Sequence, residues 1–335
     1  MTNDQYAASF QQIIAQLNDA QRRAVQQTEG PVLAIAGPGT GKTHMLTARI
    51  GQILLHSDAQ ALNILCLTFT DAAVNAMRQR LLSFIGPEAH RVHIYTFHSF
   101  CNKVIQENLE AFGRHDLEPL SDLERIAILR AIIDGLDVEH PLRLGRRDPY
   151  YYERHLTSLF QLMKGERWSV EYLEAHIEDF IQSLPERPEY RYQRSAGAFK
   201  KGDLKEAKYQ KTHRRMERLR HAVYLFKDYE DALEQQQRYD YDDMVLWVVE
   251  AFEENEQLLR TYQEQYLYFL VDEFQDTNGS QSAIVDQLVA YWGDNPNLFI
   301  VGDDDQSIYE FQGARMKNMT DFYDQYRKNV LLIVL

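Results

Sequence analysis

The segment Ala36 to Thr43 (AGPGTGKT) has glycines, a lysine and a threonine at the spacing of a phosphate-binding loop. Its three glycines permit a backbone that turns successive N–H groups toward one point, where an anion can be held. An apolar run precedes the loop and a helical pattern follows it, so the positive end of a helix should add to this anion site. Lys42 would then reach the β- and γ-phosphates of a nucleotide, and Thr43 would supply a hydroxyl to Mg²⁺. These features predict a P-loop, with a glycine-rich turn that binds nothing as the alternative.

Two neighbouring acids, Asp272 and Glu273, follow the apolar run Tyr266 to Val271 (YLYFLV). Acids at a strand end often only solvate a turn. Beside a P-loop they suit two different roles, in which Asp272 holds Mg²⁺ through water and Glu273 takes a proton from the attacking water. The pair therefore favours nucleotide hydrolysis over phosphoryl transfer to a second substrate.

The segments that carry these residues predict an α/β fold built on a parallel sheet. Short apolar runs alternate with helical patterns along the first hundred or so residues, as expected for strands joined by crossover helices. Each apolar run ends at a polar turn. The expected strands are Pro31 to Ala36, Leu62 to Phe69, Val92 to Tyr95, Tyr266 to Val271 and Leu298 to Val301.

The pattern between residues 101 and 238 is helical, with no convincing strand. A crossover between parallel strands needs little more than one helix, so a helical stretch of roughly 140 residues indicates an inserted domain. We therefore expect an α/β domain formed by residues 1–100 and 239–335, interrupted by a mainly helical domain over residues 101–238.

The composition fits a soluble globular protein, with 44% hydrophobic and 26% charged residues among 335. The longest apolar runs are too short to span a membrane, and the N-terminus has no secretory signal. Cys66 and Cys101 lie in apolar surroundings without the spacing of a metal site or a disulfide framework. A cytoplasmic address is the simplest expectation.

The net charge of −14 argues against non-specific binding to a polyanion, but the charge is unevenly distributed. Residues Arg187 to Arg220 include twelve Lys or Arg and only four Asp or Glu. This stretch either contacts an anionic partner or forms a solvated helix face.

Seven motifs occur in order along the chain, and together they resemble the N-terminal half of a UvrD/Rep family helicase of superfamily 1A. The resemblance implies a RecA-like P-loop NTPase domain, 1A, with a helical insertion, 1B. It also accounts for Ala36, since the family has Ala at the first P-loop position. The motifs are LNDAQ (17–21), AGPGTGKT (36–43), TFTDAAVNAMRQRL (68–81), YTFHSF (95–100), YDYDDM (239–244), VDEFQDTN (271–278) and VGDDDQSIYEFQGA (301–314).

The resemblance implies an ATP site that uses Mg²⁺. Gln21 is similar to the Q-motif glutamine, whose amide can donate to and accept from the adenine edge, although a surface glutamine before a helix is the alternative. Gln306 is similar to the sensor of the γ-phosphate. The implied catalytic residues are Lys42, Asp272, Glu273 and Gln306, and the implied Mg²⁺ ligands are Thr43 and Asp272. The implied ATP-binding residues are Gln21, Ala36, Gly37, Pro38, Gly39, Thr40, Gly41, Lys42 and Thr43.

The resemblance also implies a track for single-stranded DNA, in which aromatic side chains stack on bases. For Phe69 the alternative to DNA contact is a place in the core. For His98 the alternative is a buried position in which the side chain fixes a turn. By motif position the track residues are Phe69, Thr96, His98, Tyr309 and Phe311, and the basic stretch would add Arg214, Arg215 and Arg218 near duplex or single-stranded DNA.

Three features bear on this comparison. After Tyr309 many relatives have Arg-Trp-Arg where residues 310–312 read EFQ, so phosphate contact should be weaker here. His44 stands where many relatives have Arg. The acidic run Asp303 to Asp305 either adjusts the Mg²⁺ region or solvates a turn.

The implied function is an ATP-dependent DNA helicase or translocase that moves 3′ to 5′ on single strands and acts at single-strand/duplex junctions. The family's second motor domain supplies an NYRS-type motif and a later arginine, and neither occurs among these 335 residues. We therefore expect a fragment that binds ATP but hydrolyses it poorly. The alternatives are a nucleotide-gated, non-motor module that binds DNA or protein, and a small-molecule kinase, which would share only the P-loop.

Overall fold

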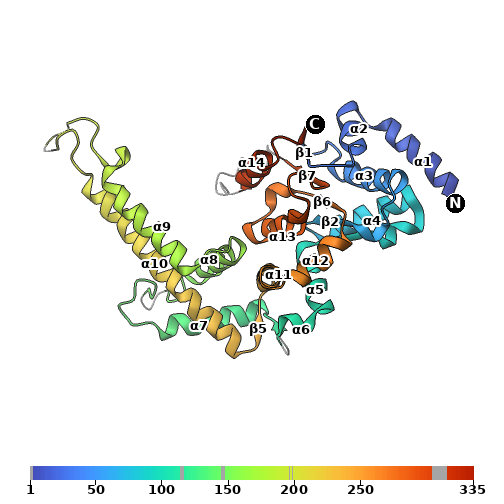
Figure 1. Ribbon diagram of the computed structural model, residues 1–335. Helices are drawn as coiled ribbons and strands as arrows, with labels where there is room; N and C mark the ends of the chain where they lie inside the picture. Colours follow the sequence, from blue (N-terminus) through green and yellow to red (C-terminus); the bar gives the residue numbers. More distant parts are fainter. Residues whose placement is uncertain (1–2, 114–116, 145–147, 196, 198, 304–314) are drawn as a thin grey trace. The chain divides into compact units, whose positions relative to one another are not determined.

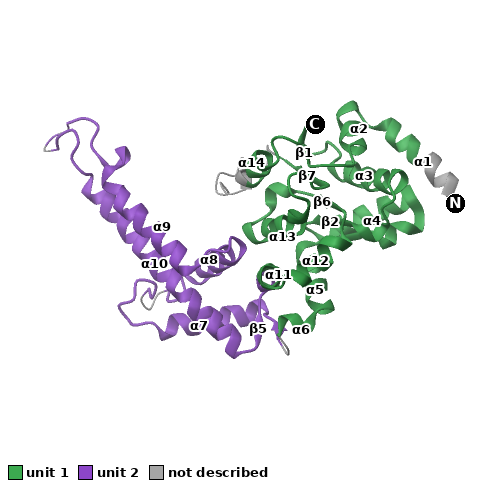
Figure 2. Ribbon diagram, viewed as in Figure 1, with its two compact units in different colours: residues 1–113, 244–335 green, residues 114–243 purple. Residues whose placement is uncertain are grey.

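The computed structural model describes residues 3–113, 117–144, 148–195, 197, 199–303 and 315–335. The chain divides into two compact units (Figures 1 and 2). Unit 1 comprises Met1–Gly113 and Met244–Leu335, and unit 2 comprises Arg114–Asp243. No helix among the described residues combines the length and the apolarity needed to cross a bilayer.

Unit 1 is built on a six-stranded sheet in which every neighbouring pair is parallel, in the order β3-β2-β6-β7-β1-β8. Five of its strands fall where apolar runs predicted them, because strands buried on both faces read as continuous hydrophobic sequence, while the edge strand at residues 331–334 was not among those expected. This confirms the expected α/β class with a parallel sheet. The strands are β1 (Val32–Ile35), β2 (Ile64–Thr68), β3 (His93–Thr96), β6 (Tyr268–Val271), β7 (Leu298–Gly302) and β8 (Leu331–Val334).

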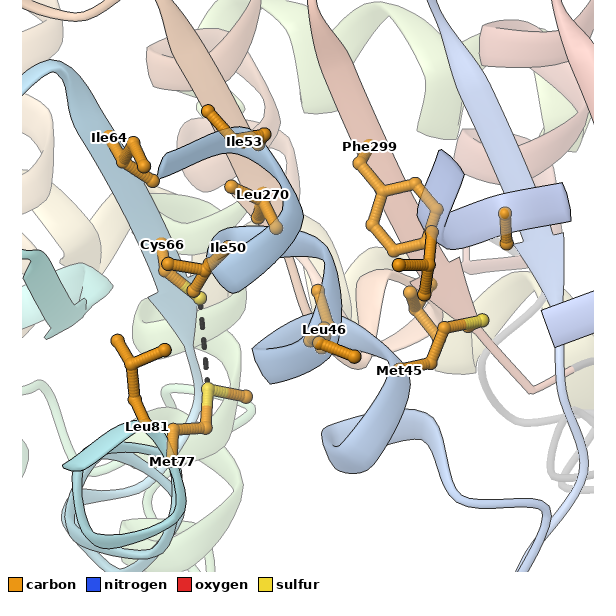
Figure 3. Close-up of a cluster of buried hydrophobic side chains, with 14 of the residues drawn as sticks. Met45, Leu46, Ile50, Ile53, Ile64, Cys66, Met77, Leu81, Leu270 and Phe299 are labelled. Atoms are coloured by element: carbon orange, nitrogen blue, oxygen red, sulfur yellow. Dashed lines mark hydrogen bonds between the residues drawn. The ribbon is translucent and has the colours of Figure 1, made fainter. Parts of the chain in front are cut away.

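One face of the sheet packs against the N-terminal helices. The core on this side joins Leu46 and Ile50 of α3 with strand residues such as Cys66 and Leu270 (Figure 3). The Cys66 thiol donates to the Met77 sulfur at 3.7 Å, which brings α4 against β2. The helices of this layer are α1 (Asn3–Gln16), α2 (Asp19–Gln26), α3 (Lys42–His56) and α4 (Asp71–Ile85).

Alternate strand residues face the opposite side of the sheet, since successive side chains of a strand point to opposite faces. Phe269 of β6 contacts Tyr266 there, and Tyr266 in turn contacts Phe100 of α5. The expected insertion began at residue 101, but α5 and α6 both belong to unit 1. The remaining helices of eight or more residues in or entering this unit are α5 (Phe97–Glu107), α11 (Tyr241–Glu254), α12 (Glu256–Gln265), α13 (Gly279–Val289) and α14 (Arg315–Gln325), and α6 is Leu109–Phe112.

Unit 2 is mainly helical and has its own apolar core, to which α7, α8, α9 and α10 all contribute. Its helices are α7 (Asp122–Gly135), α8 (Glu153–Gly165), α9 (Val170–Ser183) and α10 (Glu206–Gln235). A short parallel pair, β4 (Glu118–Pro119) with β5 (Arg238–Tyr239), departs from the expectation of no strand in this region. Two residues in each strand are too few to produce a readable alternation.

Candidate nucleotide-binding site

The P-loop connects β1 to α3 at the carboxyl edge of the sheet. β1 ends at Ile35, α3 begins at Lys42, and the partly exposed Thr43 lies in the first turn of α3. Gly39 and Gly41 have φ of 77° and 86°, a left-handed conformation that favours glycine. Gly41 is the N-cap of α3 and provides no side-chain cap. The first N–H groups of α3 can therefore serve an anion at the positive end of the helix.

Lys42 joins the P-loop to the acidic turn after β6. Its Nζ lies 2.7 Å from Oε2 of Glu273, although 231 positions separate the two residues in sequence. Asp303, which follows β7, has its Oδ2 at 3.8 Å from the same Nζ. The Lys42 side chain is only 10% exposed. The sheet thus brings one lysine between carboxylates from two separate strands.

Asp272 is a buried carboxyl at the same strand end. It is 3% exposed, and its Oδ1 accepts the backbone N–H of Glu273 at 3.1 Å. Burial raises the pKa of Asp272 to about 7, the charge of Glu273 adds to the rise, and Lys42 opposes it. The approach of another cation would favour the ionised form of a carboxyl in this environment and so lower its pKa.

Gln275 holds the Glu273 carboxylate in place and was not among the residues expected from the sequence. Its Nε2 donates to Oε2 of Glu273 at 2.9 Å, and its Oε1 accepts the N–H of Asp303 at 2.9 Å. Glu273 has φ of 50°, which is unusual for a residue with a side chain. The only sequence signal for Gln275 was its place inside VDEFQDTN, because its contact with the residue after β7 exists only in the folded chain.

Gln21 is brought to the P-loop by α2. Its Nε2 donates to the carbonyl of Thr40 at 2.8 Å, while its Oε1 accepts the N–H of Asn18 at 3.1 Å in a capping box. An adenine that hydrogen-bonds to the Gln21 amide would therefore have to replace one of these two hydrogen bonds. The ring of His44 meets the ring of Phe84 edge to face, with centroids 5.6 Å apart. Burial, together with the charge of Arg80, lowers the pKa of His44.

Three of the residues expected to contact DNA lie at the carboxyl ends of the adjacent strands β2 and β3. Phe69 is partly exposed and meets Phe97 edge to face at 5.8 Å. Thr96 is 8% exposed, and its hydroxyl caps α5. His98, in the first turn of α5, is partly exposed. Three other expected site residues, Gln306, Tyr309 and Phe311, lie outside the described part of the chain.

The remaining expected DNA contacts belong to unit 2. Arg214, Arg215 and Arg218 all lie on α10, but only Arg215 and Arg218 line a cavity between α10 and α8. The expected nucleotide-site residues therefore belong to unit 1, and these arginines belong to unit 2.

A parallel sheet with a P-loop after one strand and an acidic pair after another defines a RecA-like P-loop NTPase fold. The family model for the UvrD/REP helicase N-terminal domain matches residues 17–327, and the chain belongs to this family. This confirms the resemblance inferred from the seven motifs.

The curated relatives include bacterial helicases named ATP-dependent DNA helicase PcrA. The protein from Bacillus subtilis strain 168 is 29% identical over 325 residues, which covers 97% of this chain and 37% of that protein. The protein from Staphylococcus epidermidis strain RP62A is 29% identical over 315 residues, and that from Staphylococcus aureus strain NCTC 8325 is 28% identical over 315 residues. In both cases the match covers 94% of this chain and 37% of the relative.

Proposed function

We propose that this chain provides the first motor domain and the insertion domain of an ATP-dependent DNA helicase. Unit 1 would be motor domain 1A, and unit 2 would be the insertion 1B. The observation that carries the proposal is the Lys42–Glu273 ion pair, because it joins a phosphate-binding loop to a candidate general base. The relatives, which are named ATP-dependent DNA helicases, support the same activity.

ATP is the proposed substrate and Mg²⁺ the proposed cofactor. The Thr43 hydroxyl and the Asp272 carboxylate are hard oxygen ligands of the kind that Mg²⁺ prefers, and the buried Asp272 would ionise more readily beside a cation. When bound, the metal would neutralise phosphate charge. The N–H groups of the P-loop and Lys42 would bind the phosphates, and Gln21 would hold the adenine edge.

The proposed hydrolysis begins when Lys42 leaves Glu273 for the γ-phosphate. The released Glu273 carboxylate then accepts a proton from water as the water oxygen attacks the γ-phosphorus. The bond between that phosphorus and the β–γ bridging oxygen breaks, and ADP leaves with the electron pair. Gln306 would sense the γ-phosphate. Nucleotide binding would thus free the general base, Glu273, that hydrolysis requires.

The proposed DNA substrate is a single strand next to a duplex, with 3′ to 5′ movement driven by ATP. Phe69, Thr96, His98, Tyr309 and Phe311 would line the track. The relatives are far longer than the segment they share with this chain, which spans 37% of their length. In this family the second motor domain supplies arginines that can raise the phosphoryl-transfer rate by orders of magnitude. We therefore propose that this chain binds Mg-ATP but turns it over slowly by itself.

Mg-ATP binding and steady-state hydrolysis by this chain, with and without oligo-dT, test the proposal. Lys42→Ala should weaken Mg-ATP binding by about tenfold or more, because it removes a charge-assisted phosphate contact. Lys227→Ala, an exposed change on α10, should leave binding unaltered. Unchanged affinity in Lys42→Ala would refute the P-loop assignment. Strong DNA-stimulated turnover by the unmodified chain would refute slow hydrolysis and favour a self-sufficient protein.

A further inference from the structure

A groove with a volume of about 690 Å³ lies between α8 and α10 of unit 2. Its lining combines apolar, aromatic and cationic side chains. The apolar residues are Leu142, Leu156, Leu159, Leu219 and Ala222. The proposed nucleotide site and strand track, all in unit 1, account for none of these residues.

The α8 side of the groove presents an exposed aromatic surface. The rings of Tyr151 and His155 stack at an interplanar angle of 24° with centroids 5.4 Å apart. Tyr151 remains 50% exposed, and it meets Tyr152 edge to face at 4.9 Å. The Tyr152 hydroxyl accepts a hydrogen bond from Nη1 of Arg218 at 3.0 Å. One flat ring is therefore held in place while much of its surface stays open to a ligand.

The α10 side presents a row of cations. Lys208, Lys211, Arg215 and Arg218 recur at intervals of three or four residues, which places them on one face of the helix over about 15 Å. No described lining residue is an acid, and neither Lys211 nor Arg215 forms an ion pair with any described residue. In a chain of net charge −14, this row provides complementarity to a polyanion.

We propose that this groove, formed by Tyr151, His155 and the α10 cations, binds a short segment of single-stranded DNA apart from the track of unit 1. The inference rests on the proposed DNA-binding function. Bases would stack on Tyr151 and contact the apolar lining, and phosphates would contact Lys211 and Arg215 without sequence preference. An open ring in a partly apolar groove suits unstacked bases, whereas a duplex keeps its bases stacked inside. An acidic peptide would have no need of the stacking surface.

Anisotropy titration of this chain with labelled oligo-dT, and with an abasic oligonucleotide of the same length, tests the stacking. Tyr151→Ala should weaken oligo-dT binding by about fivefold to a hundredfold and leave abasic binding unchanged. Tyr172→Ala is the matched control. Tyr172 is 46% exposed, and its ring centroid lies 4.0 Å from that of His176, four residues further on. Neither residue lines the groove. This control should bind both oligonucleotides as the unmodified chain does.

The salt dependence of binding tests the phosphate contacts. Arg215→Gln should reduce the slope of log affinity against log salt by about 0.7, whereas Lys227→Gln, further along α10, should not. Thermal melting of each variant would verify that the fold is intact. Equal effects of Tyr151→Ala and Tyr172→Ala, or an equal loss of abasic binding in Tyr151→Ala, would overturn the proposal.

Three further outcomes separate this proposal from others. Displacement of oligo-dT by poly-glutamate at equal charge concentration, with the same sensitivity to Tyr151→Ala, would overturn it in favour of an acidic peptide. If the unmodified chain failed to bind oligo-dT at all, the DNA-binding part of the proposed function would fail. If it bound oligo-dT but every groove variant behaved like its control, only the groove assignment would fail.

Discussion

Replacing Glu273 by Gln should tighten the binding of Mg-ATP while it suppresses hydrolysis. Lys42 is held by Glu273 at 2.7 Å and must leave this carboxylate to reach a phosphate. A hydrogen bond to a charged group contributes about 1.5–3 kcal/mol. Because the Glu273 side chain is 33% exposed, we discount this to about 1–2 kcal/mol. Gln can keep a neutral contact with Lys42 but removes the charge that competes with the phosphates.

The expected result is a Kd for Mg-ATP that falls by a factor of about 5–30, since about 1.4 kcal/mol corresponds to tenfold. Calorimetric titration of the two proteins measures this directly. Turnover should fall by about 10² to 10⁴, the usual contribution of a general base. Asp276→Asn makes the same change of charge in the same motif, where the carboxylate accepts from Gln275 at 3.4 Å, and it should leave the Kd nearly unchanged. An unchanged or higher Kd in a normally folded Glu273→Gln protein would refute the competition argument.

Four further predictions concern charge and packing. Lys164→Met should reduce the free energy of unfolding by about 3–5 kcal/mol in denaturant titrations, because its side chain is 0% exposed and faces three carboxylates. Adding Asp243→Asn should restore part of the loss, and no restoration would contradict the charge argument. Mg-ATP affinity should increase as pH rises through about 7, the pKa of Asp272, because only the ionised carboxylate binds a cation. An affinity that does not change with pH would exclude Asp272 as a metal ligand. The same raised pKa means that the folded protein retains this proton, so the contribution of Asp272 to stability should decrease as pH rises from about 4 to about 7. Gly51→Ala should destabilise the protein by about 1–3 kcal/mol, because its Cβ would lie 2.6 Å from the ring of Phe10, and an unchanged melting temperature would show that α1 can shift.

Local sequence was sufficient for five of the six strands of the sheet and for the P-loop. A strand buried on both faces is a continuous apolar run, and a P-loop consists of consecutive residues between a strand and a helix. The start of α10 was harder to predict from the sequence. Its apolar residues recur at helical spacing only from Met216 onward, whereas the helix begins at Glu206, because the residues before Met216 include many exposed cations and carry little hydrophobic periodicity.

The sequence also identified both members of the Lys42–Glu273 pair, but not their contact. The order of the strands in the sheet decides which strand ends meet, and nothing local to either motif encodes that order. Gln275 was missed for the same reason, since its bond to the residue after β7 depends on β6 and β7 being neighbours. Asp272 was expected as a metal ligand, but its raised pKa follows from burial, which depends on the packed fold.

Unit 2 gives the clearest division between the two kinds of information. The sequence determined that cations gather between Arg187 and Arg220 and that a helix carries several of them. Only the tertiary structure decided that Arg215 lines a groove while Arg214 does not. Consecutive residues of a helix point about 100° apart, and packing against α8 determines which of these directions opens into the groove.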